Sequence, residues 1–118
     1  MKLNVFLSTI ISCISFAVFL SSCTKKKDVI IMDCGVTSAG FAADVNPIIQ
    51  STCAINSACH GVGSVSGPGP LTNYIQISGV ATRIKEAVIS RRMPLGSTLS
   101  EANINKIKCW VASGAPNN

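Results

Sequence analysis

CAINSACHG, residues 53–61, joins a cysteine directly to the only histidine in the chain, Cys59 to His60. A second cysteine, Cys53, stands six positions before Cys59. A single histidine is most often a structural or surface residue. Few histidines, however, lie directly after a cysteine and before a run as rich in glycine and proline as residues 61–70, which is typical of a loop. The arrangement therefore predicts a site at which sulfur and imidazole act together.

Covalent haem uses such a pair, and its usual attachment run is Cys-x-x-Cys-His. Here Asn56 occupies the position of the first cysteine of that run. Small residues dominate the segment between Cys53 and Cys59, so we expect its three extra positions to loop out. Cys59 and Cys53 would then form the two thioethers, and His60 would be the proximal iron ligand. In a competing arrangement Cys59 alone attaches the haem and Cys53 pairs with another cysteine.

A second axial ligand is expected from the opposite side of the iron, and methionine is common there in cytochromes c. Met93 follows His60 by 33 positions, after a loop and a predicted helix. Pro94 comes next and keeps the backbone at Met93 stiff and non-helical, which suits a thioether held against a metal. An isolated methionine can also be core filler. With Cys59 and His60 upstream, we interpret Met93 as the distal ligand.

Apolar residues recur at helical spacing in two segments before Pro94. One helix is predicted within residues 41–53, where Pro47 marks either the first turn, with Asn46 as the N-cap, or a break in a longer helix. A second helix is predicted to open near Ser78 and to stop before Pro94. A long Gly-rich loop separates the two.

The last helix has the clearest signals. Ser100 is the predicted N-cap, Gly114 is predicted to end the helix at C′, and Trp110 belongs to its apolar face. No alternation typical of strands and no internal repeat is found. The predicted fold class is therefore all-α, with long loops.

Three runs occur in a specific order: PIIQSTCAINSACHG (47–61), RMPLG (92–96) and INKIKCWVASGAPNN (104–118). Together they resemble a family of small monohaem c-type cytochromes of bacterial envelopes, similar to class I, over residues 41–118. The resemblance implies a small cytochrome c-like helical domain with long loops around one haem c. It implies covalent attachment through Cys59, with His60 and Met93 as iron ligands and Trp110 packed in the closing helix. The longer gap between the cysteines departs from the family pattern.

The remaining cysteines predict a disulfide. If haem takes Cys53 and Cys59, then Cys34 and Cys109 are left, and pairing them leaves no free thiol in an oxidising compartment. The rival pairing joins Cys53 to Cys109, and sequence alone does not decide connectivity. A zinc site built from these cysteines and His60 is disfavoured, because zinc ligands usually come as close Cys-x-x-Cys pairs.

Residues 1–22 have the pattern of a secretory signal: an early Lys2, an apolar run, and small residues before Cys23. LSSC at residues 20–23 resembles a bacterial lipobox, which implies lipidation of Cys23; an uncleaved membrane anchor is the alternative. We expect residues 23–33 to be a lipidated N-terminus and linker, and residues 34–118 to be the cytochrome c-like domain. Position 24 is not Asp, which favours the outer membrane, facing the periplasm.

The formal net charge of +5 is spread along the chain, with no basic stripe interleaved with aromatic residues. Nucleic acid is therefore a poor candidate partner. The sequence predicts an electron carrier rather than an enzyme, with redox proteins as partners and a membrane reached through lipid. Arg91 and Arg92 are interpreted as a solvated helix end, or alternatively as groups that face an acidic partner or the haem carboxylates. The alternative function is a haem-free, disulfide-bonded lipoprotein that acts as a structural or binding module, in which Cys53 pairs with Cys59, alone or in addition to Cys34 with Cys109.

Overall fold

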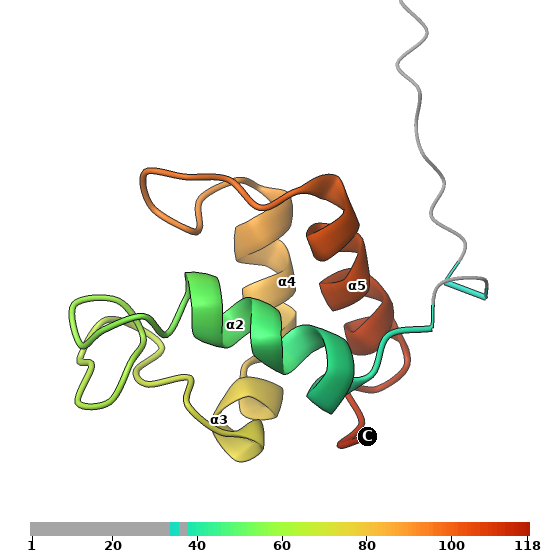
Figure 1. The fold of residues 1–118 in the computed structure, drawn as a ribbon, viewed down its shortest axis with the longest axis horizontal. Helices are drawn as coiled ribbons and strands as arrows, with labels where there is room; N and C mark the ends of the chain where they lie inside the picture. Colours follow the sequence, from blue (N-terminus) through green and yellow to red (C-terminus); the bar gives the residue numbers. More distant parts are fainter. Residues whose placement is uncertain (1–33, 36–37) are drawn as a thin grey trace, which may run out of the picture. The chain divides into compact units, whose positions relative to one another are not determined.

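The computed structural model describes residues 34–35 and 38–118. The predicted signal peptide, the lipidation site Cys23 and the linker to residue 33 lie outside the described residues. The described part contains a π-helical turn, η1, and four α-helices, α2 to α5, with no strand (Figure 1). This confirms the all-α prediction. None of these helices has both the length and the apolar character needed to cross a membrane.

The first helical segment is longer than the pattern around Asn46 suggested. η1 (Phe41–Val45) runs directly into α2 (Asn46–Thr52), and Asn46 has helical backbone angles of φ −59° and ψ −47°. The prediction of Asn46 as an N-cap is therefore wrong, and the segment starts after Gly40. Pro47 has no N–H to donate to the preceding turn. The wide π-turn just before it accommodates this loss by using i→i−5 bonds, such as Val45 N to Gly40 O at 3.2 Å.

The second predicted helix is two helices. α3 (Tyr74–Gly79) begins at Asn73, whose side chain accepts a hydrogen bond from Gln76 N, and α4 (Ala81–Ile89) follows after Val80. The expectation that Ser78 opens a helix is therefore wrong. The cap at Asn73 begins α3 before Ser78, and Val80 separates α3 from α4. The predicted apolar stripe of α4 is buried at Ile84, Ala87 and Val88.

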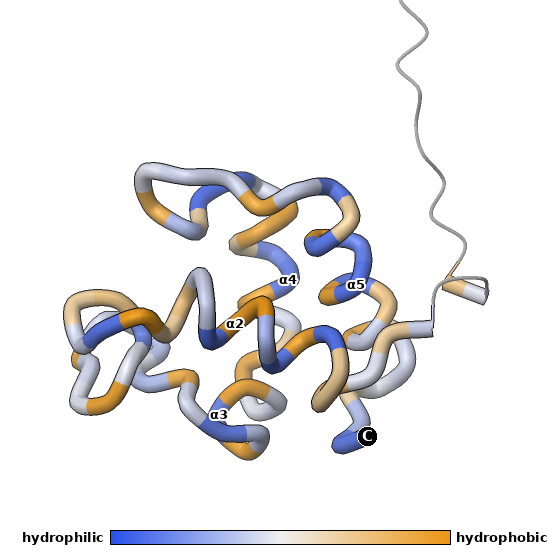
Figure 2. Tube along the Cα trace, viewed as in Figure 1, coloured by the Kyte–Doolittle hydropathy of each residue, from blue (hydrophilic) through white to orange (hydrophobic). Residues whose placement is uncertain are grey.

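The last helix matches its prediction. α5 (Glu101–Ala112) is capped by Ser100, whose hydroxyl accepts from Asn103 N at 3.2 Å, and Gly114 follows its end with φ +93°. Gly114 N bonds to Val111 O, which is one of the two bonds of a Schellman motif. α4 and α5 lie side by side (Figure 1), and both contain hydrophobic and hydrophilic residues along their length (Figure 2).

Trp110 is the centre of the core. Its side chain is fully buried, its ring centroid lies 5.7 Å from that of Phe41, and Phe41 in turn meets Tyr74 edge-on at 5.0 Å. The indole N–H of Trp110 donates to Pro116 O at 2.9 Å, so its only polar group is satisfied inside the core. This cluster joins η1, α3 and α5.

Two long-range ties close the domain. Cys34 and Cys109 form a disulfide across a sequence separation of 75, which is the pairing preferred on sequence grounds, and the rival pairing of Cys53 with Cys109 is wrong. Asn118 supplies two acceptors: its side-chain oxygen to Phe41 N at 2.9 Å and its backbone oxygen to Ala42 N at 2.7 Å. The chain after α5 therefore satisfies amides at the start of η1 that have no partner within that helix.

Candidate functional site

The segment between the two free cysteines forms a closed loop. Cys53 ends α2, its amide bonding back to Ile49 O at 2.8 Å, and the chain then turns outward through residues 55–58, which are mostly exposed. It returns so that His60 N donates to Cys53 O at 3.0 Å. The extra residues thus loop out as predicted, and Cys53 and His60 are brought together at the neck of the loop.

Asn56 and Gly61 hold this loop in shape. The backbone oxygen of Asn56 accepts from Gly61 N at 2.8 Å, and its side-chain oxygen accepts from Cys59 N at 3.1 Å. A Cβ at position 61 would lie 2.7 Å from the carbonyl carbon of Asn56 and 3.0 Å from Ala54 O. Only glycine fits this close approach of two backbone segments. Neither role was predicted from the sequence, although the glycine directly after His60 was a visible signal.

The imidazole of His60 is held in one tautomer. Its exposed fraction is only 8%, and Nδ1 lies 3.0 Å from Gly69 O. Because a carbonyl oxygen can only accept, Nδ1 carries the hydrogen, and the neutral ring keeps the lone pair of Nε2 for another partner. Nε2 has no hydrogen-bond partner among the described residues and is not sealed in the core, so it borders the open space that His60 lines.

That open space consists of two cavities with a common wall. The first, of about 200 Å³, is bounded by α4 and is called here the α4 cavity. The second, of about 300 Å³, is bounded by residues 55–59 and 94–97 and is called the loop cavity. The walls of both contain Cys53, His60, Gly67 and Met93. Of these two cavities, Cys59 lines only the loop cavity. The structure therefore brings all four sequence-predicted site residues to one region.

The thiols of Cys53 and Cys59 are both free. Burial raises the pKa of the Cys53 thiol, opposed by its contact with the Thr52 hydroxyl at 3.5 Å, and the neighbouring Cys59 raises this pKa further. Cys53 is buried and Cys59 is half-buried. A buried thiol with a raised pKa is less reactive toward solvent reagents. Cys53 is shielded from bulk solvent and lines both cavities.

Met93 is placed by the end of α4. The amides of Arg92 and Met93 both bond to Ala87 O, at 3.0 and 3.2 Å. These bonds fasten the backbone of Met93 to the last turn of α4, and the side chain lines both cavities. The segment that follows, residues 94–97, forms part of the wall of the loop cavity.

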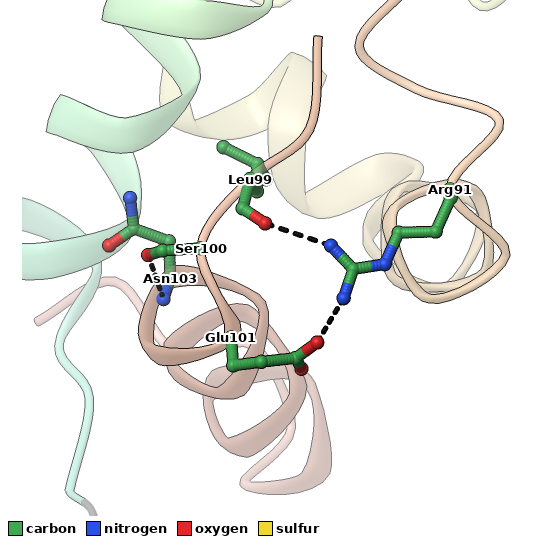
Figure 3. A network of polar contacts seen from close by, with 5 residues as sticks. All are labelled: Arg91, Leu99, Ser100, Glu101 and Asn103. Carbon is green, nitrogen blue, oxygen red and sulfur yellow. Dashed lines mark hydrogen bonds and ion pairs between the residues drawn. The ribbon is translucent and has the colours of Figure 1, made fainter.

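Arg91 has an unusual backbone for its residue type. Its φ of +58° lies in the left-handed region, which costs a non-glycine residue about 1 kcal/mol. With Arg91 N bonded to Val88 O and Arg92 N to Ala87 O, α4 ends in a Schellman motif with Arg91 at C′, where glycine is usual. The guanidinium donates to Leu99 O at 2.9 Å and forms an ion pair with Glu101 (Figure 3). Arg91 and Arg92 are thus both exposed at the end of α4, as expected, but Arg91 is ion-paired and lines neither of the two cavities.

Two other arginines line the α4 cavity. Arg83 and Arg92 are exposed, contribute to its wall, and form no ion pair with the described carboxylates. No role for Arg83 at a site was predicted from the sequence. The signal for the cavity was its position four residues before Ala87, on the same helix face. The cavity therefore has apolar walls from α4 with positive charge beside them.

No family model, curated protein or solved structure matches this chain. Within residues 34–35 and 38–118, no group of three or more His, Cys, Asp or Glu side chains is arranged to hold a metal ion. The candidate site is of a different composition, since it combines one imidazole, one thioether and two thiols.

Proposed function

We propose that this chain transfers electrons through one covalently bound haem c, with His60 and Met93 as axial iron ligands. One observation carries the proposal. Cys53, His60 and Met93 come from three separate places in the sequence, the end of α2, the following loop and the end of α4, yet all three line both cavities. Thiol, imidazole and thioether are the groups by which proteins hold this cofactor.

The donor set fits the cofactor in detail. The hydrogen bond from His60 Nδ1 to Gly69 O orients the ring and leaves Nε2 to bind iron, as metal-bound histidines commonly do. The buried Cys53 thiol and the half-buried Cys59 thiol flank His60 and would form the thioethers. The apolar side chains of α4 give the cavity a hydrophobic wall, and the guanidinium groups of Arg83 and Arg92 suit acidic substituents of the bound group.

A c-type haem supplies a one-electron couple, and a methionine ligand opposite histidine raises its potential. His60 and Met93 would both hold the iron, which would leave it no open position for a substrate. We therefore propose a carrier that exchanges electrons with redox partner proteins, rather than an enzyme. We further propose that it works in the bacterial cell envelope, anchored through lipid on Cys23, in the outer membrane facing the periplasm.

The alternative function is a haem-free lipoprotein that serves as a structural or binding module. The observation in its favour is the Cys34–Cys109 disulfide, which together with the buried Trp110 would hold a small domain without a cofactor. The two proposals differ in one measurable property, because only the first requires a coloured group bound through sulfur.

The experiment is to express the full chain in cells that mature c-type cytochromes and to record its absorption spectrum and mass. The proposal expects sharp bands on reduction and a haem mass that stays with the chain after denaturation. A colourless chain without the haem mass, from cells that mature another cytochrome normally, would refute it. Cys53→Ala and Cys59→Ala separately report on each thioether, and loss of both thiols should release all haem.

Two variants test the distal ligand. Met93→Leu keeps the bulk of the side chain but removes its sulfur, and Met93→Ala removes both. If the thioether binds iron, both variants change the spectrum and lower the reduction potential. A spectrum that changes in Met93→Ala and stays as wild type in Met93→Leu would mean that Met93 only fills space.

A further inference from the structure

The segment that follows Met93 has few polar ties of its own. Among residues 94–98 no side-chain or backbone group forms a hydrogen bond with the rest of the described chain. Leu95 is 79% exposed, and the chain becomes buried again only at Leu99. Residues 94–98 are called here the distal loop. No hydrogen bond of its own therefore fixes this loop beside the cavities.

The two ends of the distal loop are joined by Arg91. Its side chain leaves the end of α4, donates to Leu99 O and pairs with Glu101 at the first position of α5 (Figure 3). Ser100 lies between these two acceptors and caps α5 through Asn103 N. The guanidinium thus connects the end of α4 to the start of α5, and Met93 lies in the segment between them. These two contacts of Arg91, with Leu99 O and with Glu101, are called here the clasp.

The residue type at position 91 is unexpected on local grounds. α5 ends in the same Schellman arrangement as α4, and there the left-handed position is taken by Gly114. At the end of α4 the chain places Arg91 in this conformation instead. Both members of the ion pair are well exposed, at 42% and 64%, and exposed pairs contribute little to global stability. A strained backbone at a residue whose side chain ties two segments together indicates a local function for that side chain.

We propose that Arg91 is a positioning residue for Met93: by tying Leu99 O and Glu101 to the end of α4, it holds the distal loop closed and the thioether at the cavities. The proposal rests on the proposed function in so far as the thioether binds iron. The closed loop excludes competing ligands from the side that Met93 occupies. Opening of the loop raises the population of chains in which Met93 has left its place.

The first test uses added imidazole, which competes with a weak thioether for ferric haem. In Arg91→Gly the backbone strain and the clasp are both removed, and Glu101→Gln removes only the charge of the pair. Arg91→Gly should bind imidazole about tenfold more tightly than wild type, because losing both the charged hydrogen bond and the ion pair shifts the loop toward open states by that order. Glu101→Gln should shift the affinity in the same direction by a smaller factor, because it loses only the exposed pair. Arg91→Lys, which keeps the charge but can reach fewer acceptors, should fall between.

Lys106→Gln is the matched control, because it removes the other ion pair of the described residues, with Asp44, away from the distal loop. Its imidazole affinity should equal that of wild type. The urea midpoint of Arg91→Gly should stay close to wild type while its imidazole affinity changes. Equal imidazole affinity in Arg91→Gly and wild type, or a shift of the same size in Lys106→Gln, overturns the proposal.

A second measurement separates failure of this inference from failure of the proposed function. Dilute hydrogen peroxide oxidises exposed methionine to the sulfoxide, and mass spectrometry of the peptide containing Met93 follows the rate. In a chain that carries no haem, the proposed function fails, but the clasp still predicts faster oxidation of Met93 in Arg91→Gly than in Lys106→Gln. Equal rates in these two haem-free variants would show that Arg91 does not hold the loop.

Discussion

The amide of His60 donates to the carbonyl oxygen of Cys53 across 3.0 Å, although the two residues are seven positions apart. In one turn of α-helix the same bond joins residues four positions apart, which is the separation of the first cysteine and the histidine in Cys-x-x-Cys-His. The longer segment of this chain therefore ends in the hydrogen bond that the short run would make. The three additional positions are taken up by the exposed part of the loop.

Deleting residues 55–57 should leave this neck intact. The remaining sequence, Cys-Ala-Ala-Cys-His-Gly, lets the amide of His60 reach Cys53 O within a single helical turn. We expect a folded protein with haem content equal to wild type and an unfolding free energy within about 1 kcal/mol, because short changes in loop length cost little. Urea denaturation and the ratio of haem to protein measure the two quantities.

A replacement of residues 55–57 by three glycines is the control for this deletion. It keeps the length of the loop but removes the bond from Cys59 N to the side chain of Asn56. It should therefore be less stable than the deletion. A deletion variant that loses its fold or its haem would contradict the view that the extra residues are only an insertion.

Gly61→Ala should destabilise the site. Its new Cβ would meet backbone atoms of Asn56 at 2.7 and 2.8 Å, and these atoms cannot turn aside as a flexible side chain would. We expect a loss of about 1–3 kcal/mol in unfolding free energy, typical of overpacking. Gly79→Ala is the control, because a Cβ at the end of α3 would meet nothing within 4 Å. Equal stability of both variants would argue against the close approach.

The Cys34–Cys109 disulfide should contribute strongly to the stability of the domain. Its sequence separation is 75, for which the chain-entropy model gives about 4 kcal/mol. The double variant Cys34→Ser, Cys109→Ala should lose about 2–5 kcal/mol in urea or guanidinium unfolding. Adding a reductant should lower the stability of wild type toward that of the double variant and leave the double variant unchanged. A double variant as stable as oxidised wild type would contradict this expectation.

Asp44 should make the unfolding free energy of the domain fall measurably at acid pH. Its hydrogen-bonded contact with Lys106 at 2.8 Å, and then the bond from Gly40 N, hold the pKa of its carboxyl below the ordinary value. Because the folded pKa is lowered, the stabilisation is fully present above the unfolded pKa of about 4 and is lost as the pH falls through the folded value. Asp44→Asn should therefore be less stable than wild type at pH 7, and the difference should shrink below about pH 4. A difference that does not vary with pH would exclude this linkage.

Helices whose ends are marked by their own residues could be predicted from the sequence. Helices whose ends depend on contacts with other segments of the chain could not. Ser100 and Gly114 mark the ends of α5 through their own side chain and backbone freedom, so the sequence alone locates that helix. Asn46 looks like a cap before Pro47, yet the turn before it is helical because η1 bonds back to Gly40 and packs Phe41 on Trp110. α3 escaped prediction because it is short and ends in glycine.

The sequence indicated the candidate ligating groups of the site. It did not indicate the residues that hold the surrounding backbone in place. Cys53, His60 and Met93 stand out because sulfur and imidazole in this order have few other uses. The clasp from Arg91 was not visible, because glycine rather than arginine is expected in the left-handed position that ends a helix. The partnership of Asn56 and Gly61 depends on a backbone approach that no side-chain pattern records.

The placement of the disulfide also determines how the domain responds to mechanical tension. The entire region from α2 to the distal loop lies between Cys34 and Cys109. The disulfide links the two ends of this region directly and so carries a force applied across it. A pull between a point upstream of Cys34 and a point downstream of Cys109 passes through that bridge. Such a force stretches only the segments outside the bridge, and the pocket between His60 and Met93 is not extended by it.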